Sequence, residues 1–180
     1  MKRNTIIKAV AGGVSALLIL LAVTVADSFF QPVVSPAQTP SVDLVVVEKQ
    51  QHLMQLFDHG KLVKSYQVAL GRGGPGPKTL EGDNKVPEGV YQITGRLPRS
   101  AFHLALHIGY PTEAQRLAAT QAHVDPGGDV MIHGIRKGFG WIGSLHRRLD
   151  WTRGCVAVTD AEIEEIWRLV PDGATIDIRP

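Results

Sequence analysis

The sequence is a succession of short apolar segments, and most of them are separated by turns that contain Gly, Pro or Asp. This pattern sharply limits the folds that the chain can adopt. Segments with β-branched or alternating apolar residues are typical of strands. Only two segments suit helices, 112–123 and the stretch that begins with the capping box Thr159 to Glu162. Many short strands with one or two short helices predict a mainly β domain (β-rich α+β), a sandwich or barrel. We expect strands at 42–47, 53–57, 62–70, 89–95, 102–108, 129–133, 155–158 and 174–178.

The first thirty residues differ from the remainder in composition. A basic start (Lys2, Arg3, Lys8) precedes an uncharged and mostly apolar run from Ala9 to Ala26. This pattern predicts a signal peptide or a membrane-spanning anchor within residues 1–30, with the basic end in the cytoplasm. Residues 31–41 carry three prolines and predict a linker, so the domain should occupy 42–180, in the periplasm or cell envelope.

Charge and motif spacing exclude several function classes. The formal charge is only +2 and no basic stripe is visible, so we expect no nucleic-acid partner. Gly71 to Gly76 fits G-x-G-x-x-G, but Pro75 and Pro77 prevent the helix start which that motif needs, so we interpret it as a mobile loop. His103, His107 and His133 lack a metal-ligand spacing, so we expect no metal site and interpret the first two as a polar groove wall.

The single cysteine carries the clearest chemistry. Cys155 has no disulfide partner within the chain, and its non-catalytic interpretation is a small buried apolar residue. A cysteine nucleophile needs a neighbouring base near neutral pH, and His133 at the end of a strand would be a rigidly held one. Gly154 would let the backbone approach a substrate closely. The amides of Gly154 and Cys155 could stabilise an oxyanion.

The segments Met131-Ile132-His133-Gly134 and Thr152-Arg153-Gly154-Cys155 together resemble the L,D-transpeptidase catalytic domain family (YkuD type). Val86-Pro87-Glu88-Gly89-Val90-Tyr91 stands where the family has a Thr-Pro-x-Gly-x-aromatic segment. The sequence departs from the family at Val86, which replaces Thr, at Arg153, where His is frequent, and in a longer loop between His133 and Cys155.

The resemblance implies a β-sandwich with one or two short helices that acts on peptidoglycan stem peptides without metal or cofactor. His133 would be the base, held through its second nitrogen by the Gly134 carbonyl. Cys155 would form a thioester at the L–D link of a tetrapeptide stem, release D-alanine and pass the acyl group to an amine. Substrate-binding residues would be Arg153, Thr152, Tyr91 and His107, with Arg147 and Arg148 as further candidates to bind carboxylates. Two alternatives stay open: a peptidoglycan hydrolase with the same residues (L,D-carboxypeptidase or amidase), or a non-catalytic wall-binding domain that a carbapenem would not acylate.

Overall fold

A computed structural model of the chain describes residues 41–180. The predicted signal peptide or anchor (1–30) and nearly all of the predicted linker (31–41) therefore lie outside the described residues. Within 41–180, no helix is both long and apolar enough to cross a bilayer.

The described residues form the predicted series of short strands and two α-helices. Each predicted strand overlaps an observed one, because local alternation and turn residues act within a few positions of one another. The strands are β1 (Leu44–Glu48), β2 (Leu53–Asp58), β3 (Lys61–Gln67), β4 (Gly89–Ser100), β5 (His103–Ile108), β6 (Met131–His133), β7 (Val156–Ala157) and β8 (Thr175–Arg179). The helices are α2 (Glu113–Gln121), α3 (Asp160–Leu169) and the 3₁₀ segment η1 (Gly140–Arg148).

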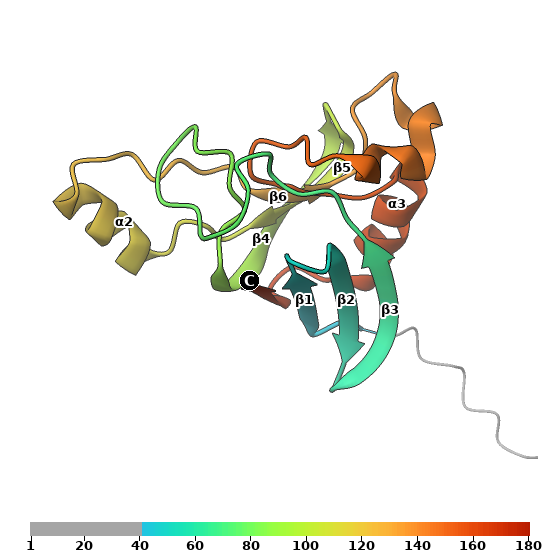
Figure 1. The fold of residues 1–180 in the computed structure, drawn as a ribbon. Coiled ribbons are helices and arrows are strands. Elements are labelled where there is room, and N and C mark those ends of the chain that lie inside the picture. Colours follow the sequence, from blue (N-terminus) through green and yellow to red (C-terminus); the bar gives the residue numbers. More distant parts are fainter. Residues whose placement is uncertain (1–40) are drawn as a thin grey trace, which may run out of the picture. The chain divides into compact units, whose positions relative to one another are not determined.

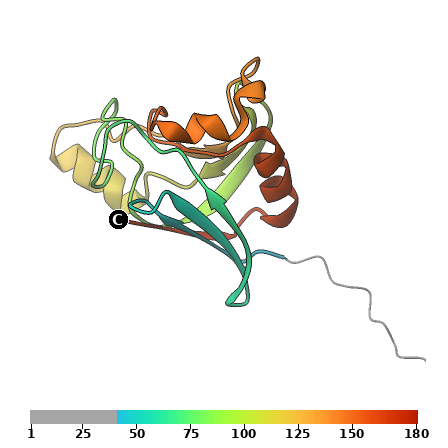
Figure 2. The ribbon, with the colours of Figure 1, turned by 45° about the vertical axis from the view of Figure 1, so that its right-hand side comes forward.

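All eight strands belong to one curled sheet in the order β3-β2-β1-β8-β4-β5-β6-β7 (Figures 1 and 2). The long strand β4 joins its two halves. Residues 89–92 pair with β8, whereas residues from Ile93 onward pair with β5 across two register shifts. Such irregularities bend a strand. The predicted sandwich is therefore replaced by a single continuous sheet that bends at β4.

The two edges of this sheet meet. Ala69, two residues beyond β3, exchanges both backbone hydrogen bonds with Ala157 of β7, at 2.9 and 2.8 Å. A second bridge joins Gly71 to Thr152. We call this junction, residues 69–72 against 152–157, the seam. It closes the sheet beside Cys155.

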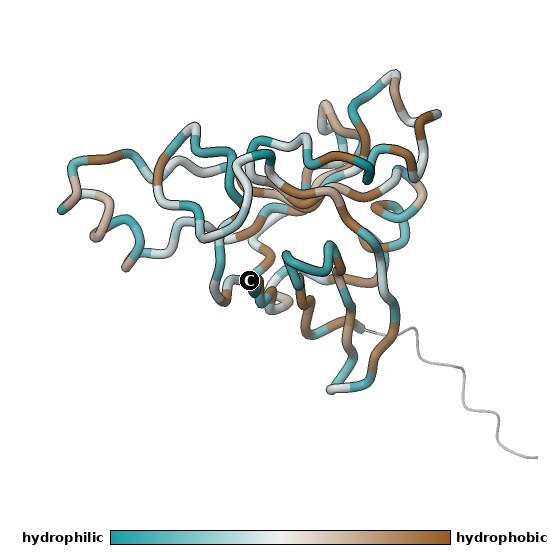
Figure 3. Tube along the Cα trace, viewed as in Figure 1, coloured by the Kyte–Doolittle hydropathy of each residue, from teal (hydrophilic) through white to brown (hydrophobic). Residues whose placement is uncertain are grey.

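Alternating apolar residues of the strands fill the interior of the curl. The brown segments of Figure 3 mark where apolar residues occur along the chain. Helix α3 adds Ile163 and Ile166, both fully buried. Burial of side chains of this size stabilises a fold by roughly 1.5–3 kcal/mol each. The capping box predicted at Thr159 and Glu162 is confirmed, since each side chain accepts a hydrogen bond from the other residue's amide.

Two segments predicted as loops contain local structure that the sequence pattern did not predict. The predicted loop 134–151 contains η1, which has a kink at Gly143. The Gly/Pro loop, residues 71–85, includes the segment Gly71 to Gly76 that we interpret as mobile, and its second half is held by the carboxylate of Asp83. This carboxylate accepts hydrogen bonds from Lys78 Nζ and from the amides of Thr79, Leu80 and Lys85.

Candidate active site

His133 ends β6 and Cys155 directly precedes the neighbouring strand β7, and both line the same cavity of about 650 Å³. Strands β6 and β7 run parallel with His133 opposite Ala157. Cys155 comes two residues before Ala157, so its side chain projects from the same face of the sheet as that of His133. Strand spacing puts the two Cβ atoms about 8 Å apart, a gap that an imidazole and a thiol can span. The structure thus brings together the two residues predicted to carry the chemistry.

The ring of His133 is fixed by its own backbone neighbourhood. Its Nδ1 lies 2.7 Å from the carbonyl oxygen of Gly134. A carbonyl only accepts, so Nδ1 carries the proton and Nε2 keeps a free lone pair. This is the contact expected from the family resemblance, and it makes Nε2 the basic atom.

Aromatic rings enclose His133, which is only 3% exposed. Phe102 lies 4.5 Å from it between ring centroids, and Trp151 lies 5.7 Å away in an edge-on arrangement. Burial lowers the pKa of His133 below its ordinary 6.5, the nearby His146 lowers it further, and the Gly134 carbonyl opposes both effects. His133 is therefore neutral near pH 7. If the ring gains a proton, the nearby ring of Phe102 can stabilise the cation.

The thiol of Cys155 is also neutral at rest. Burial raises its pKa above the ordinary 9.0, the Met131 amide lowers it, Asp129 raises it and Lys78 lowers it. The sulfur lies 3.7 Å from the carbonyl oxygen of Asp129, and the thiol donates a hydrogen bond to that oxygen. The resting pair is thus a thiol and a neutral imidazole.

The hydroxyl of Thr152 holds the turn that presents the cysteine. It accepts hydrogen bonds from the amides of Gly154 (3.2 Å) and Cys155 (3.0 Å) and donates to the Cys155 carbonyl (2.7 Å). Thr152 lines the cavity but is only 3% exposed, and its hydroxyl is engaged within the turn, so its contact with substrate stays a prediction. To bind an oxyanion, the amides of Gly154 and Cys155 would have to leave the Thr152 hydroxyl or share their hydrogen bonds with it. Their role in stabilising an oxyanion therefore stays a prediction.

Glycine is required at two positions of the site because other parts of the chain approach closely. A Cβ at Gly154, whose φ is 119°, would lie 2.7 Å from the carbonyl oxygen of Lys85. We predicted that the missing side chain of Gly154 would let a substrate approach the backbone. In the structure, the backbone of Lys85 occupies that space. A Cβ at Gly134 would lie 2.7 Å from Asp160 Oδ1, the atom that accepts from the Ile135 amide and secures the chain after His133.

The predicted substrate-binding residues divide into two groups. Arg153 is exposed and lines the cavity, together with Arg136, which the sequence did not single out. Tyr91 is wrong as a substrate ligand. It is 4% exposed within the core, donates to the Glu88 carbonyl and accepts from Gln115.

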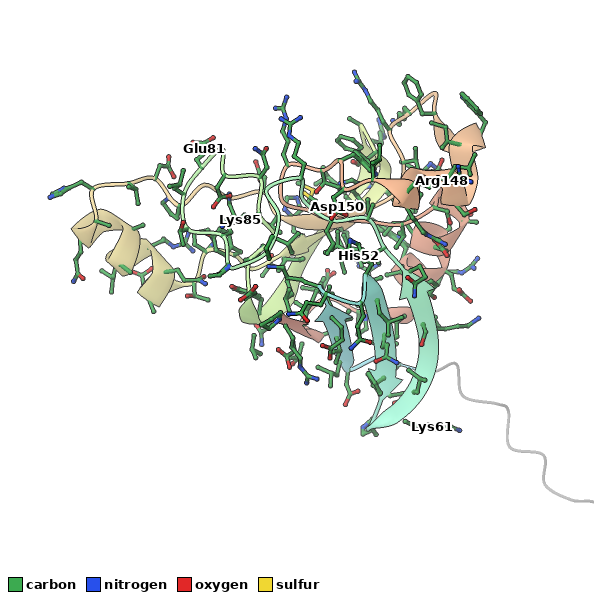
Figure 4. All side chains as sticks on the ribbon, viewed as in Figure 1. His52, Lys61, Glu81, Lys85, Arg148 and Asp150 are labelled. Carbon is green, nitrogen blue, oxygen red and sulfur yellow. The ribbon has the colours of Figure 1, made fainter. Side chains whose placement is uncertain are left out.

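The remaining candidates lie outside the cavity lining. His107 pairs with Met131 and shares the sheet face of His133, but the cavity does not extend to it. Arg147 is bound to Glu162 of α3, and Arg148 lies on η1 (Figure 4). His103, the other residue of the predicted polar groove wall, contacts Glu164 at 2.8 Å.

Two aromatic residues of the site were missed from the sequence. Phe102 lies just before β5, and Trp151 comes just before the Thr152 turn. Trp151 also donates from Nε1 to Nδ1 of the buried His146 at 3.4 Å. The position of Trp151 beside the Thr152 to Cys155 turn could have indicated that it belongs to the site. Its contact with His133 could not be predicted, because it depends on the path of the loop.

Comparisons with known proteins show the family of the chain. The family model for the L,D-transpeptidase catalytic domain, YkuD, matches residues 42–178. YafK of Escherichia coli (strain K12), whose name assigns it only provisionally to the L,D-transpeptidases, is 30% identical over 132 residues, which are 70% of this chain and 46% of YafK. The chain therefore spans less than half the length of this curated relative.

Solved structures share the fold at low sequence identity. The helical cell shape determining protein Pgp2 from Campylobacter jejuni aligns with a TM-score of 0.59 at 21% identity, over 78% of this chain and 48% of Pgp2. An L,D-transpeptidase from Xylanimonas cellulosilytica aligns with a TM-score of 0.53 at 15% identity, over 85% of this chain and 66% of that one.

Proposed function

The chain belongs to the L,D-transpeptidase catalytic domain family, and from this membership we propose that it is a cysteine acyltransferase acting on peptidoglycan stem peptides. One observation carries the proposal. Cys155 and His133 line one cavity, with His133 Nδ1 bound to a carbonyl and Nε2 left free to act as the base.

In the first half-reaction, Cys155 Sγ attacks the carbonyl carbon on the L side of the L–D link while its proton passes to His133 Nε2. The tetrahedral intermediate collapses as the C–N bond breaks, and the imidazolium protonates the departing amine of D-alanine. A thioester on Cys155 remains. The Gly134 carbonyl and the ring of Phe102 would support the transient positive charge on His133.

In the second half-reaction, the amine of another stem attacks the thioester. The amine gives a proton to His133, the C–S bond breaks, and the thiolate takes that proton back. The new amide joins two stems. Arg153 and Arg136 at the cavity are placed to bind stem carboxylates, since a guanidinium pairs with a carboxylate through two parallel hydrogen bonds.

We place this reaction in the periplasm or cell envelope, where peptidoglycan lies, with residues 9–26 as the anchor or signal segment. Fractionation of cells with an antibody against the chain tests this location. Recovery in the soluble cytoplasmic fraction would contradict it.

The test is incubation of the purified chain with tetrapeptide muropeptides, followed by intact-mass analysis of the protein and mass spectrometry of the products. We expect an acyl adduct on the wild type, none on His133→Ala, and new cross-linked dimers. Cys155→Ser serves as the matched control, since it keeps the shape of the site and lacks the thiol. Shortened monomers without dimers would assign the chain to the hydrolases, and binding without any adduct would make it a wall-binding domain.

A further inference from the structure

The segment around η1 exposes an unusual number of large apolar side chains. Ten such residues are exposed within the described part of the chain, and four of them lie within residues 139–149. These four, Phe139, Trp141, Leu145 and Leu149, are named here the η1 patch. Trp141 is 80% exposed and Leu149 is 76% exposed. Apolar side chains gathered in this way on a surface mark a binding face.

The η1 patch borders an apolar groove of about 500 Å³. Ile135, Ile142 and Trp151 line this groove together with three members of the patch. The lining combines aliphatic side chains with the rings of Phe139 and Trp151, so apolar atoms make up most of its surface.

Exposed cations flank the η1 patch, and the acidic residues of α3 that face this segment are engaged: Asp160 accepts from the Ile135 amide and Glu162 binds Arg147. Arg136, Lys137 and Arg148 are exposed beside it. Asp150 is the only acidic residue between positions 135 and 153, and it is occupied by His52 and the Leu70 amide (Figure 4). The segment therefore combines Trp, Phe and Leu with unpaired cations, which is the composition of protein surfaces that lie in a membrane interface.

We propose that the η1 patch docks onto the surface of a bilayer that contains anionic phospholipids. The apolar side chains would enter the boundary between headgroups and acyl chains, while Lys137 and Arg148 contact phosphates. A second copy of the chain is a poorer partner, because a symmetric contact would set these cations against their own copies. The proposal is independent of the reaction assigned to Cys155.

Docking would also orient the active site. Trp151 and Arg136 line both the groove and the cavity of Cys155 and His133. The cavity would then open next to the membrane surface, where it meets the wall strands nearest to the bilayer.

The test follows the fluorescence of Trp141 in the full chain mixed with vesicles whose acyl chains are brominated, since bromine quenches indoles that contact it. The vesicles contain phosphatidylcholine alone or an equal mixture with phosphatidylglycerol. Subtracting the fluorescence of Trp141→Phe from that of the wild type gives the signal of Trp141 alone. This signal reports on the η1 patch whether or not residues 9–26 insert into the bilayer. We expect quenching of Trp141 only in the anionic vesicles, weakening as salt rises.

Matched variants make the test specific. Arg148→Glu should reduce the association of the patch roughly tenfold, whereas Lys61→Glu, an equal charge change at an exposed lysine far along the chain on β3, should not (Figure 4). Leu149→Ser should likewise reduce quenching, and Leu117→Ser, at an exposed leucine of α2, should preserve it.

Three outcomes would overturn the proposal. The first is that Trp141 stays unquenched in anionic vesicles, and the second is that Lys61→Glu acts as strongly as Arg148→Glu. The third is a shift of Trp141 emission with protein concentration alone, accompanied by a dimer in sedimentation, which would assign the patch to a second copy.

Discussion

Replacing Thr152 by Val removes one hydroxyl and keeps nearly the same volume. That hydroxyl accepts from the amides of Gly154 and Cys155 and donates to the Cys155 carbonyl. Thr152 and Gly154 are buried, so water cannot replace the lost partner without entering the seam. Thr152→Val therefore leaves two amides unpaired beside the nucleophile.

The expected loss follows from those two donors. A buried amide without an acceptor costs about 1–3 kcal/mol. The full cost applies to the buried amide of Gly154, and a smaller cost applies to the amide of Cys155 because that residue is partly exposed. We therefore expect the free energy of unfolding to fall by about 2–4 kcal/mol, and Tm to fall by roughly 6–12 °C for a domain of this size. A displacement of the sulfur by about 1 Å would also slow acylation by up to about 100-fold.

Thermal denaturation and the rate of thioester formation with a carbapenem, followed by intact mass, measure the two effects. Thr152→Ser is the control, because it keeps the hydroxyl and loses one methyl group, at a cost of about 1 kcal/mol. If Thr152→Val melts and reacts as Thr152→Ser does, the hydroxyl does not organise the turn, and the reasoning fails.

Three further predictions concern the thiol, the Gly/Pro loop and a glycine. Because burial raises the pKa of Cys155, alkylation by iodoacetamide should reach half its maximal rate above pH 9; a plateau already present at pH 7 would reveal a preformed thiolate. Burial raises the pKa of Asp83, but its hydrogen bonds with amides and Lys78 lower it to about 2, so its stabilisation of about 1–2 kcal/mol is present above pH 3.8 and lost as the pH falls towards 2. Urea denaturation at pH 7 and 2.5 should therefore show a smaller loss on acidification in Asp83→Asn than in wild type; equal losses would contradict this account. Gly154→Ala should lower the free energy of unfolding by about 1–3 kcal/mol because of its positive φ and the nearby Lys85 carbonyl. Gly60→Ala, where φ is also positive but the space is open, separates the backbone effect from the clash, and equal melting temperatures of the two variants would disprove the clash.

The strands and α3 were predictable because their signals are local. Alternation over five to seven residues defines a strand, and Thr159 with Glu162 begins a helix within one turn. The curled sheet was not predictable in the same way. It depends on β1 pairing with β8, from opposite ends of the domain, and on the bend in β4. The helical segment η1 was missed because Gly140 and Gly143 interrupt any apolar period.

The site shows the same division. His133 and Cys155 were identified from residue type and motif, and the fold brings them together. Tyr91 was misassigned although a signal was present: Tyr91 and Ile93 alternate with the exposed Val90 and Gln92, which is the pattern of a core-facing strand. The neighbours of His133 could not be inferred, since they come from loops whose paths the sequence pattern does not define.

The seam makes the chemistry of the chain depend on complete folding. The backbone around Thr152 is held by the Leu70 carbonyl and the Arg72 amide, so the turn with the nucleophile is ordered by segments that belong to the opposite edge of the sheet. A chain whose N-terminal hairpin has not yet docked lacks that support. Its cysteine would lie on an unsupported turn, so we expect thioester formation at Cys155 only after the last edge of the sheet has closed.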